Sequence, residues 1–314
     1  MKSGRQWLAG LFGSLAAFGC GRGDSGHAQA SPAASQGREA HRGPRCHAGW
    51  PMPNLASSGL PNRESYDTSS ADVVLDRVTG LTWQRTVDRT AYDARRASSY
   101  CETLTLAGHS DWRLPSIIEL ASISDTSRSA PAADPVAFPN TPPEKFWSSQ
   151  RDVTNTGLGW FAFLKTGGVY VGDDIIRTAH ARCVRGPSSC GDPDVSAYSV
   201  ADDTARDTKT GLTWQRVVEH DNYTWKDAIA RCSSLGSNSG GWRLPSLREL
   251  LTLVDVTHAE AAIDATAFPN TPSEFFWSSS SSTSPAGAAW GVNFTRGSSG
   301  EALVSTKAHV RCTR

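Results

Sequence analysis

The chain has 314 residues, and its 31 basic side chains balance 31 acidic ones, so the formal net charge is zero. A neutral chain has no basic field to attract nucleic acid or an anionic membrane surface, and no nucleic-acid-binding motif is present, so nucleic acid is not an expected partner. At about 100–200 residues per domain, the length predicts two domains.

The N-terminus has two basic residues followed by a short apolar stretch over 7–18. A stretch this short is typical of a signal peptide, expected here over 1–19, and not of a membrane helix. The small residues before Cys20 resemble a bacterial lipobox, in which the cysteine becomes acylated. The alternative is an ordinary signal peptide with a later cut near 28–30. Both interpretations predict export to an oxidising compartment.

Residues 20–65 are expected to form a lipidated or secreted N-terminal segment. Its first half is rich in Gly, Ala, Ser and Arg and lacks apolar periodicity, which favours a flexible tether. The only long apolar run lies before this segment, so no internal transmembrane span is expected. We therefore expect a cell-envelope lipoprotein, on the outer membrane or the cell surface, that touches the membrane through its N-terminal lipid. Otherwise the protein is secreted.

Internal repetition is the strongest feature of the remaining chain. Five motifs occur twice in the same order: Gly80–Arg85 and Gly211–Arg216, Trp112–Ser116 and Trp242–Ser246, Ala137–Pro142 and Ala267–Pro272, Phe146–Ser149 and Phe276–Ser279, Arg182-Cys183 and Arg311-Cys312. The separation falls only from 131 to 129 residues along the unit. Such a period is too long for a solenoid and predicts two complete domains, over 66–186 and 198–314, with a linker over 187–197.

Each copy carries signals for two helices and several short strands. Asp93 and Thr224 are placed to cap a first helix, and the sequences Ser116-x-x-Glu119 and Ser246-x-x-Glu249 are capping boxes for a second. Strands are expected over 81–83, 161–164 and 292–294 and over the segments that end at Cys183 and Cys312. The prediction is an α+β fold with helices early and a small antiparallel sheet late in each copy.

Four of the seven cysteines repeat between the copies. Duplicated domains should close in the same way, which predicts the disulfides Cys101–Cys183 and Cys232–Cys312. Each bond would tie the first helix to the last strand and close a loop of about 80 residues.

Cys46 and Cys190 remain, each just ahead of one copy, and we expect them to form a disulfide that clips the two domains together. Zinc is the competing interpretation of clustered cysteines. The sequence has no Cys-x-x-Cys pair and no clustered histidines, so no metal is expected.

Taken together, the repeated motifs resemble the C-terminal domain of bacterial collagen-like adhesins, the Lcl C-terminal family, which is largely of unknown function. The resemblance covers both copies. It implies two tandem C-type-lectin-like domains, related in fold to formylglycine-generating enzymes, and a surface or secreted binding role towards a glycan or protein ligand. The alternative is a structural or assembly lipoprotein of the cell envelope without a small ligand.

Two departures from related folds limit the chemistry. Calcium-dependent lectins of this class carry a carboxylate-Pro-Asn or Gln-Pro-Asp loop and a Trp-Asn-Asp strand, whereas this chain reads Phe138-Pro139-Asn140 and Trp147-Ser148-Ser149. The reactive cysteine pair of formylglycine-generating enzymes is also unsupported, because the repeat already pairs these cysteines. With no hydrolase, zinc-protease or phosphate-loop motif, we expect no enzymatic activity and no cofactor.

Several repeated residues could serve either structure or binding. Three tryptophan pairs are expected in the core, whereas Trp160 and Trp290 follow Gly- or Ala-rich loops and are the candidate ligand-binding aromatics. The loops at 149–160 and 279–290 are the expected recognition loops. We expect the repeated arginines Arg113 and Arg243 to form ion pairs with Glu119 and Glu249. The repeated His180 and His309 are expected to be packed, hydrogen-bonded residues, and they share a face of the last strand with Arg182 and Arg311. Asp173-Asp174 is expected to lie in a solvated loop.

Overall fold

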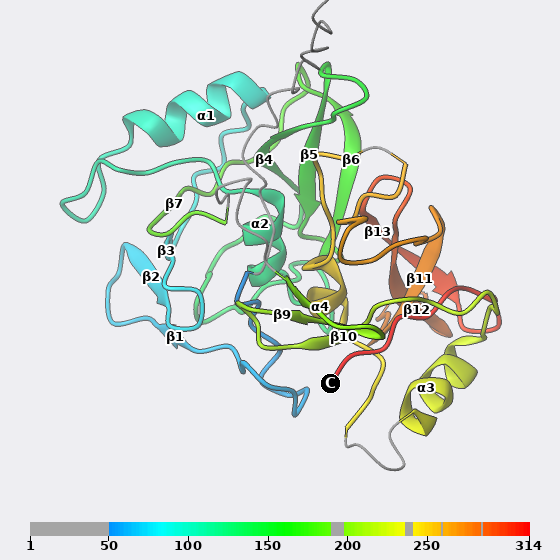
Figure 1. Ribbon diagram of the computed structural model, residues 1–314. Coiled ribbons are helices and arrows are strands. Elements are labelled where there is room, and N and C mark those ends of the chain that lie inside the picture. The colour runs from blue at the N-terminus through cyan, green and yellow to red at the C-terminus, as the bar shows by residue number, and fades with distance from the viewer. Residues whose placement is uncertain (1–49, 190–197, 236–240, 259, 284) are drawn as a thin grey trace, which may run out of the picture. The chain divides into compact units, whose positions relative to one another are not determined.

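The computed structural model describes residues 50–189, 198–235, 241–258, 260–283 and 285–314. Within these residues each copy is a mixed α/β domain with two helices and two small antiparallel sheets (Figure 1). No helix among them has both the length and the apolar character needed to cross a membrane. The predicted signal peptide, Cys20 and Cys46 at the N-terminus, and also Cys190, lie outside the described residues.

Copy 1 builds its first sheet from both ends of its sequence, in the order β1-β2-β3-β7. The elements of copy 1 are β1 (Tyr66–Asp67), β2 (Val73–Asp76), β3 (Thr82–Gln84), α1 (Ala94–Thr103), α2 (Ile117–Ile123), β4 (Lys145–Arg151), β5 (Leu158–Phe163), β6 (Gly168–Asp174) and β7 (Val184–Arg185). The second sheet has the order β4-β5-β6. The chain therefore returns to its starting sheet after completing the second one.

Copy 2 repeats this plan. Its elements are β8 (Tyr198–Val200), β9 (Thr204–Asp207), β10 (Thr213–Gln215), α3 (Trp225–Ser234), α4 (Leu247–Leu251), β11 (Phe275–Ser281), β12 (Ala288–Asn293) and β13 (Ser298–Leu303). The sheets have the orders β10-β9-β8 and β11-β12-β13, and Thr313 bridges to Trp214 where copy 1 has β7.

Local signals in the sequence explain where the helices begin. The Asp93 carboxylate accepts a hydrogen bond from the Arg96 amide at 2.9 Å and caps α1. Ser116 and Glu119 form the expected capping box at the start of α2, and Ser246 and Glu249 form it at α4.

The expectation of one late sheet per copy was incomplete, because each copy also forms a sheet before its helices. The turn at Gly80, with a φ of 73°, lets β2 fold back on β3. Asp76 holds this turn by accepting hydrogen bonds from the Val78 amide and the Thr79 hydroxyl at 2.9 and 2.7 Å. The hairpin signal is present in the sequence, but its pairing with the last strand is a long-range contact.

The two copies pack against each other through equivalent elements. Helix α2 lies beside α4, and β6 lies beside β13. One hydrophobic cluster runs from copy 1 into copy 2 and includes Ile118, Trp160, Leu250 and Trp290. A smaller cluster in each copy surrounds its own disulfide. Because the largest core is shared, we expect neither copy to be stable without the other.

The segments that precede the two copies form hydrogen bonds to the equivalent glutamates Glu249 and Glu119. The Asn54 amide donates to Glu249 Oε1 at 3.0 Å and its oxygen accepts from the Ser246 hydroxyl at 2.7 Å. In copy 1 the Ser189 amide donates to Glu119 Oε1 at 3.0 Å, and its hydroxyl lies 2.6 Å from that of Ser116. Thus the segment before copy 1 is bound by copy 2, and the segment before copy 2 is bound by copy 1.

Candidate functional site

The repeated Trp-Arg-Leu-Pro-Ser-x-x-Glu-Leu motif is a structural unit. Both guanidinium nitrogens of Arg113 donate to the Glu119 carboxylate, at 2.7 and 2.8 Å. Arg243 and Glu249 repeat this fork at 2.6 and 2.8 Å. Both glutamate side chains are buried, so each pair is charge-assisted and shielded from water. The predicted ion pairs are confirmed.

Arg182 and Arg311 are fully buried and serve the scaffold. Arg182 donates to the carbonyl oxygens of Gln84 and Arg85 at 2.7 and 2.8 Å and to the Thr141 hydroxyl at 2.7 Å. Arg311 makes the same three bonds in copy 2. Because burial removes water from the charged group, it lowers the pKa of both arginines to about 9. Each guanidinium also lies over two phenylalanine rings.

The candidate ligand-binding tryptophans do not face solvent. Trp160 is 2% exposed and Trp290 is 1% exposed, and both belong to the core shared by the two copies. Each sits on the middle strand of its sheet, where the pleat turns every second side chain inward. A sugar ring cannot stack on either indole, so the prediction that Trp160 and Trp290 contact ligand was wrong.

The expected recognition loops are shorter than predicted. Half of each range, 149–160 and 279–290, belongs to the strands β4 and β5 or β11 and β12, leaving 152–157 and 282–287 as the connections. In copy 2 the serine run over 278–282 hid the end of β11, because serine is a weak strand former and the pairing strand supplies the needed contacts.

The two predicted disulfides within the copies are present. Cys101 bonds to Cys183 and Cys232 to Cys312, closing loops of 82 and 80 residues. Each joins the first helix to the segment that re-enters the first sheet. All four cysteines are buried and take part in a hydrophobic cluster.

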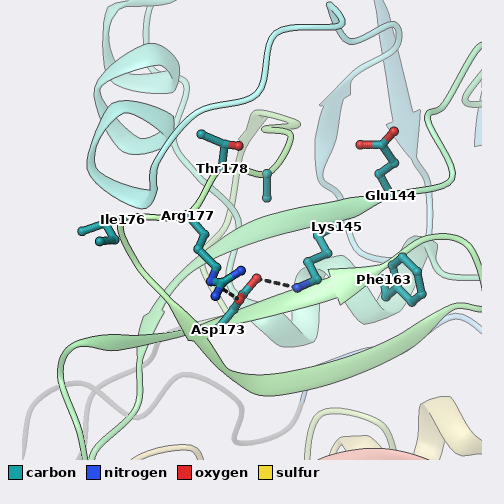
Figure 2. Close-up of a pocket in the computed structure, with 8 residues that line it drawn as sticks. Glu144, Lys145, Phe163, Asp173, Ile176, Arg177 and Thr178 are labelled. Atoms are coloured by element: carbon teal, nitrogen blue, oxygen red, sulfur yellow. Dashed lines mark hydrogen bonds and ion pairs between the residues drawn. The ribbon is translucent and has the colours of Figure 1, made fainter.

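A cavity that opens to solvent on copy 1 is lined by charged side chains. It measures about 550 Å³ and includes Glu144, Lys145, Asp173 and Arg177 (Figure 2). Asp173 lies between the two cations: Lys145 Nζ is 2.7 Å from one carboxylate oxygen and Arg177 Nε is 3.9 Å from the other. Lys145 also lies 4.8 Å from the centre of the Phe161 ring.

Two further residues give this pocket an open rim. Glu144 is 68% exposed at its side chain and reaches His180 Nε2 at 3.3 Å. Ile176 is 76% exposed and is the most exposed large apolar side chain of the described residues. The pocket thus offers both charge signs and an apolar contact to a ligand that approaches from solvent.

A one-residue insertion places Asp173 in the pocket. In copy 1 Gly159 pairs with Asp173 and Trp160 pairs with Val171, which leaves Gly172 as a bulge with a φ of 121°. In copy 2 Ala289 and Trp290 pair with successive residues, Ala302 and Glu301. Because Gly172 is an extra residue, Asp173 in copy 1 occupies the strand position that Ala302 occupies in copy 2. Asp173-Asp174 is the end of β6 and not the solvated loop that was expected.

The rest of the pocket also differs between the copies. Phe275 stands where copy 1 has Lys145, and Thr306 stands where it has Arg177, whereas Glu274 and His309 keep the 3.1 Å pair that matches Glu144 and His180. Sequence reasoning missed this site because it weighted the residues that repeat. The useful signal in the sequence is a position that is charged in one copy and apolar in the other, such as Lys145 and Phe275.

The described residues hold no group of three or more metal-ligating side chains. The repeated polar residues are instead engaged with one another. The geometry defines a class: a tandem, disulfide-closed α/β protein whose copies share a hydrophobic core and differ in the charged pocket of copy 1.

The comparison with protein families agrees with this class. The family model of the Lcl C-terminal domain matches residues 72–185 and 203–314, so the chain belongs to that family and contains two copies of its domain. The chain matches no curated protein.

Proposed function

We propose that this protein is a non-enzymatic binding module of the cell surface, which holds a protein or glycan ligand in the pocket of Glu144, Lys145, Asp173 and Arg177. One observation carries the proposal: the copies share their scaffold, yet this pocket has three charged residues, Lys145, Asp173 and Arg177, that copy 2 lacks. Ion pairs with an exposed cation add little to stability, and Lys145 and Arg177 are both exposed, so the scaffold has little need of them. A difference in charge at an open pocket, on an otherwise shared scaffold, is best explained by binding of a ligand there.

On this proposal each copy is a C-type-lectin-like domain that acts without metal or cofactor. Family membership and the disulfide between the first helix and the returning end of each copy support this fold. The internal engagement of Arg113, Glu119 and Arg182 supports a role without catalysis, because residues held in this way are not free to react with a substrate.

Display at the surface rests on export and acylation at Cys20. Cells that express the full chain and grow with radiolabelled palmitate should give a labelled protein in the membrane fraction. Cys20→Ser should remove the label and release the protein. An unlabelled wild-type protein outside the membrane fraction would show that it is secreted without an anchor.

The pocket is tested by giving copy 1 the residues of copy 2. The variant Lys145→Phe, Asp173→Ala, Arg177→Thr should lose the ligands that the wild-type protein captures from envelope extract or on a glycan array. The control Arg89→Thr, Lys226→Ala also removes two cations, from exposed positions with no described partner, and should keep them. Capture that weakens with salt is expected, because the charged ends of Glu144, Lys145 and Arg177 are exposed to solvent.

Unchanged capture by the copy-2 variant would overturn the pocket as the binding site. Robust protein partners that persist in that variant, with no glycan signal, would instead favour an assembly role in the envelope.

A further inference from the structure

A second cavity lies where the segment before copy 1 meets both copies. It measures about 280 Å³ and is lined by residues of that segment, of the turn after α2 and of β11, among them Leu55, Ser57, Leu60, Thr126, Ser279 and Ser281. Small-molecule sites commonly form at such junctions, and this volume lies just below their usual range of about 300–1,000 Å³. The groove shares no lining residue with the charged pocket of copy 1.

The groove offers no free charge. Arg248 is the one charged residue that lines it, and its guanidinium is already used. It donates to the carbonyl oxygens of Ser124 and Pro53, both at 2.9 Å, and lies 3.1 Å from the Glu64 carboxylate. Both charged side chains are largely buried. An anionic ligand would find no unpaired cation here, and a cationic ligand no unpaired carboxylate.

Hydroxyl groups dominate the polar lining. Within the described part of the chain, the side chains of Ser57, Thr126, Ser279 and Ser281 make no hydrogen bond. Each hydroxyl can donate one hydrogen bond and accept two, which matches another hydroxyl better than it matches a charged group. An apolar ligand would displace water from these hydroxyls without replacing the hydrogen bonds that the water makes.

Two half-buried leucines, Leu55 and Leu60, complete the lining. They give an apolar contact beside the hydroxyls. A pyranose ring has the matching character, with C–H groups on its faces and hydroxyls at its edge. We propose that this groove binds an uncharged saccharide, of one or two rings at the groove itself. The inference rests on the proposed binding function and adds a second site with its own ligand class.

Copy 1 lacks the equivalent groove chemistry. At the positions of Ser279 and Ser281 it has Ser149 and Arg151, so a guanidinium replaces one hydroxyl. The equivalent of Asn54 is Ser189, and the sequence between Ser189 and copy 2 has no leucine to match Leu55 and Leu60. This difference makes Ser149 a matched control for Ser279.

The test is titration of the full-length protein, by calorimetry, with the saccharides that a glycan array selects from neutral hexose and N-acetylhexosamine oligomers and from sulfated ones. We expect a neutral oligomer to bind, with an affinity that changes little between about 50 and about 500 mM salt. The double variant Ser279→Val, Ser281→Val should weaken binding by about tenfold or more. Ser149→Val should not.

Folding is checked by circular dichroism and by the unfolding midpoint. Where Ser279→Val unfolds the protein, the exposed Ser57 and Ser281 provide the variants Ser57→Val and Ser281→Val. The absence of any neutral ligand, equal binding by folded groove variants, or binding confined to sulfated oligomers would each overturn the proposal. The copy-2 variant of the charged pocket should still bind the neutral saccharide. If the groove fails while that variant still loses its partners, the proposed function stands without the groove.

Discussion

The hydroxyl of Ser299 bonds to both backbone groups of Val169, accepting from the amide at 2.8 Å and donating to the carbonyl at 3.1 Å. The two residues occupy the same position in the two copies, as the second residue of β6 and of β13. Equivalent positions that meet in this way define an approximate two-fold axis between the copies. The tandem repeat therefore packs as an isologous dimer does, but within one chain.

Ser299→Ala should lower the free energy of unfolding by about 1–3 kcal/mol, because it leaves the buried Val169 amide and carbonyl without a partner. Chemical denaturation measures this change. Ser305→Ala alters an exposed serine in the following turn and should be neutral. Equal stability of both variants would mean that water replaces the Ser299 hydroxyl and that the axis contact adds nothing.

Local signals made much of each copy predictable. The capping residues Asp93 and Ser116 fixed the helix starts, because a cap depends on a side chain and an amide three residues away. The repeat itself predicted the disulfides, since two copies of one fold must close alike. The return of β7 to β3 could not be predicted, because only two residue pairs join them across a separation of about a hundred residues.

The candidate site was harder to predict for a different reason. Repetition identifies what the fold requires, and Arg113, Arg182 and Trp160 proved to be such residues. The pocket around Asp173 depends on a bulge at Gly172, which shifts the register of one strand by one residue. A shift of one residue exchanges the faces of a strand, so it alters a site without leaving a motif.

Loss of either disulfide should destabilise the protein substantially. On the loop-entropy model, Cys101→Ala with Cys183→Ala, which opens a loop of 82 residues, should cost about 4.5 kcal/mol. Cys232→Ala with Cys312→Ala should cost a similar amount, since its loop has 80 residues. Denaturation under non-reducing conditions measures both. A marked difference between the two costs would show that packing around the sulfurs, and not loop closure, controls the effect.

The two buried turn aspartates predict a pH dependence of stability. Burial raises the pKa of Asp76 and Asp207 above the ordinary value of 3.8, against the opposing hydrogen bonds of the turn. The folded protein therefore holds these protons more tightly than the unfolded chain does. Relative to Asp76→Asn, Asp207→Asn, the wild-type protein should be most stable below pH 3.8 and should lose free energy of unfolding as the pH rises through the raised pKa values.

The matched comparison is Asp202→Asn, at an exposed aspartate, which should show the wild-type pH profile. Parallel profiles for the wild-type protein and the double variant would contradict the raised pKa values. NMR titration of the Asp76 carboxyl group measures its pKa in the folded protein directly.

Arg182 should not tolerate lysine, although the charge is kept. A lysine ammonium cannot span the two carbonyl oxygens and the Thr141 hydroxyl that the guanidinium joins, and the positive charge stays buried. Arg182→Lys should therefore cost on the order of 3 kcal/mol, and Arg311→Lys should cost as much in copy 2. Denaturant midpoints measure both. Arg185→Lys is the control, because Arg185 pairs with the exposed Asp111 and its substitution should cost less than about 0.5 kcal/mol. If Arg182→Lys matched that control, the guanidinium would be a replaceable cation and not the tie between β3 and the Phe-Pro-Asn-Thr motif.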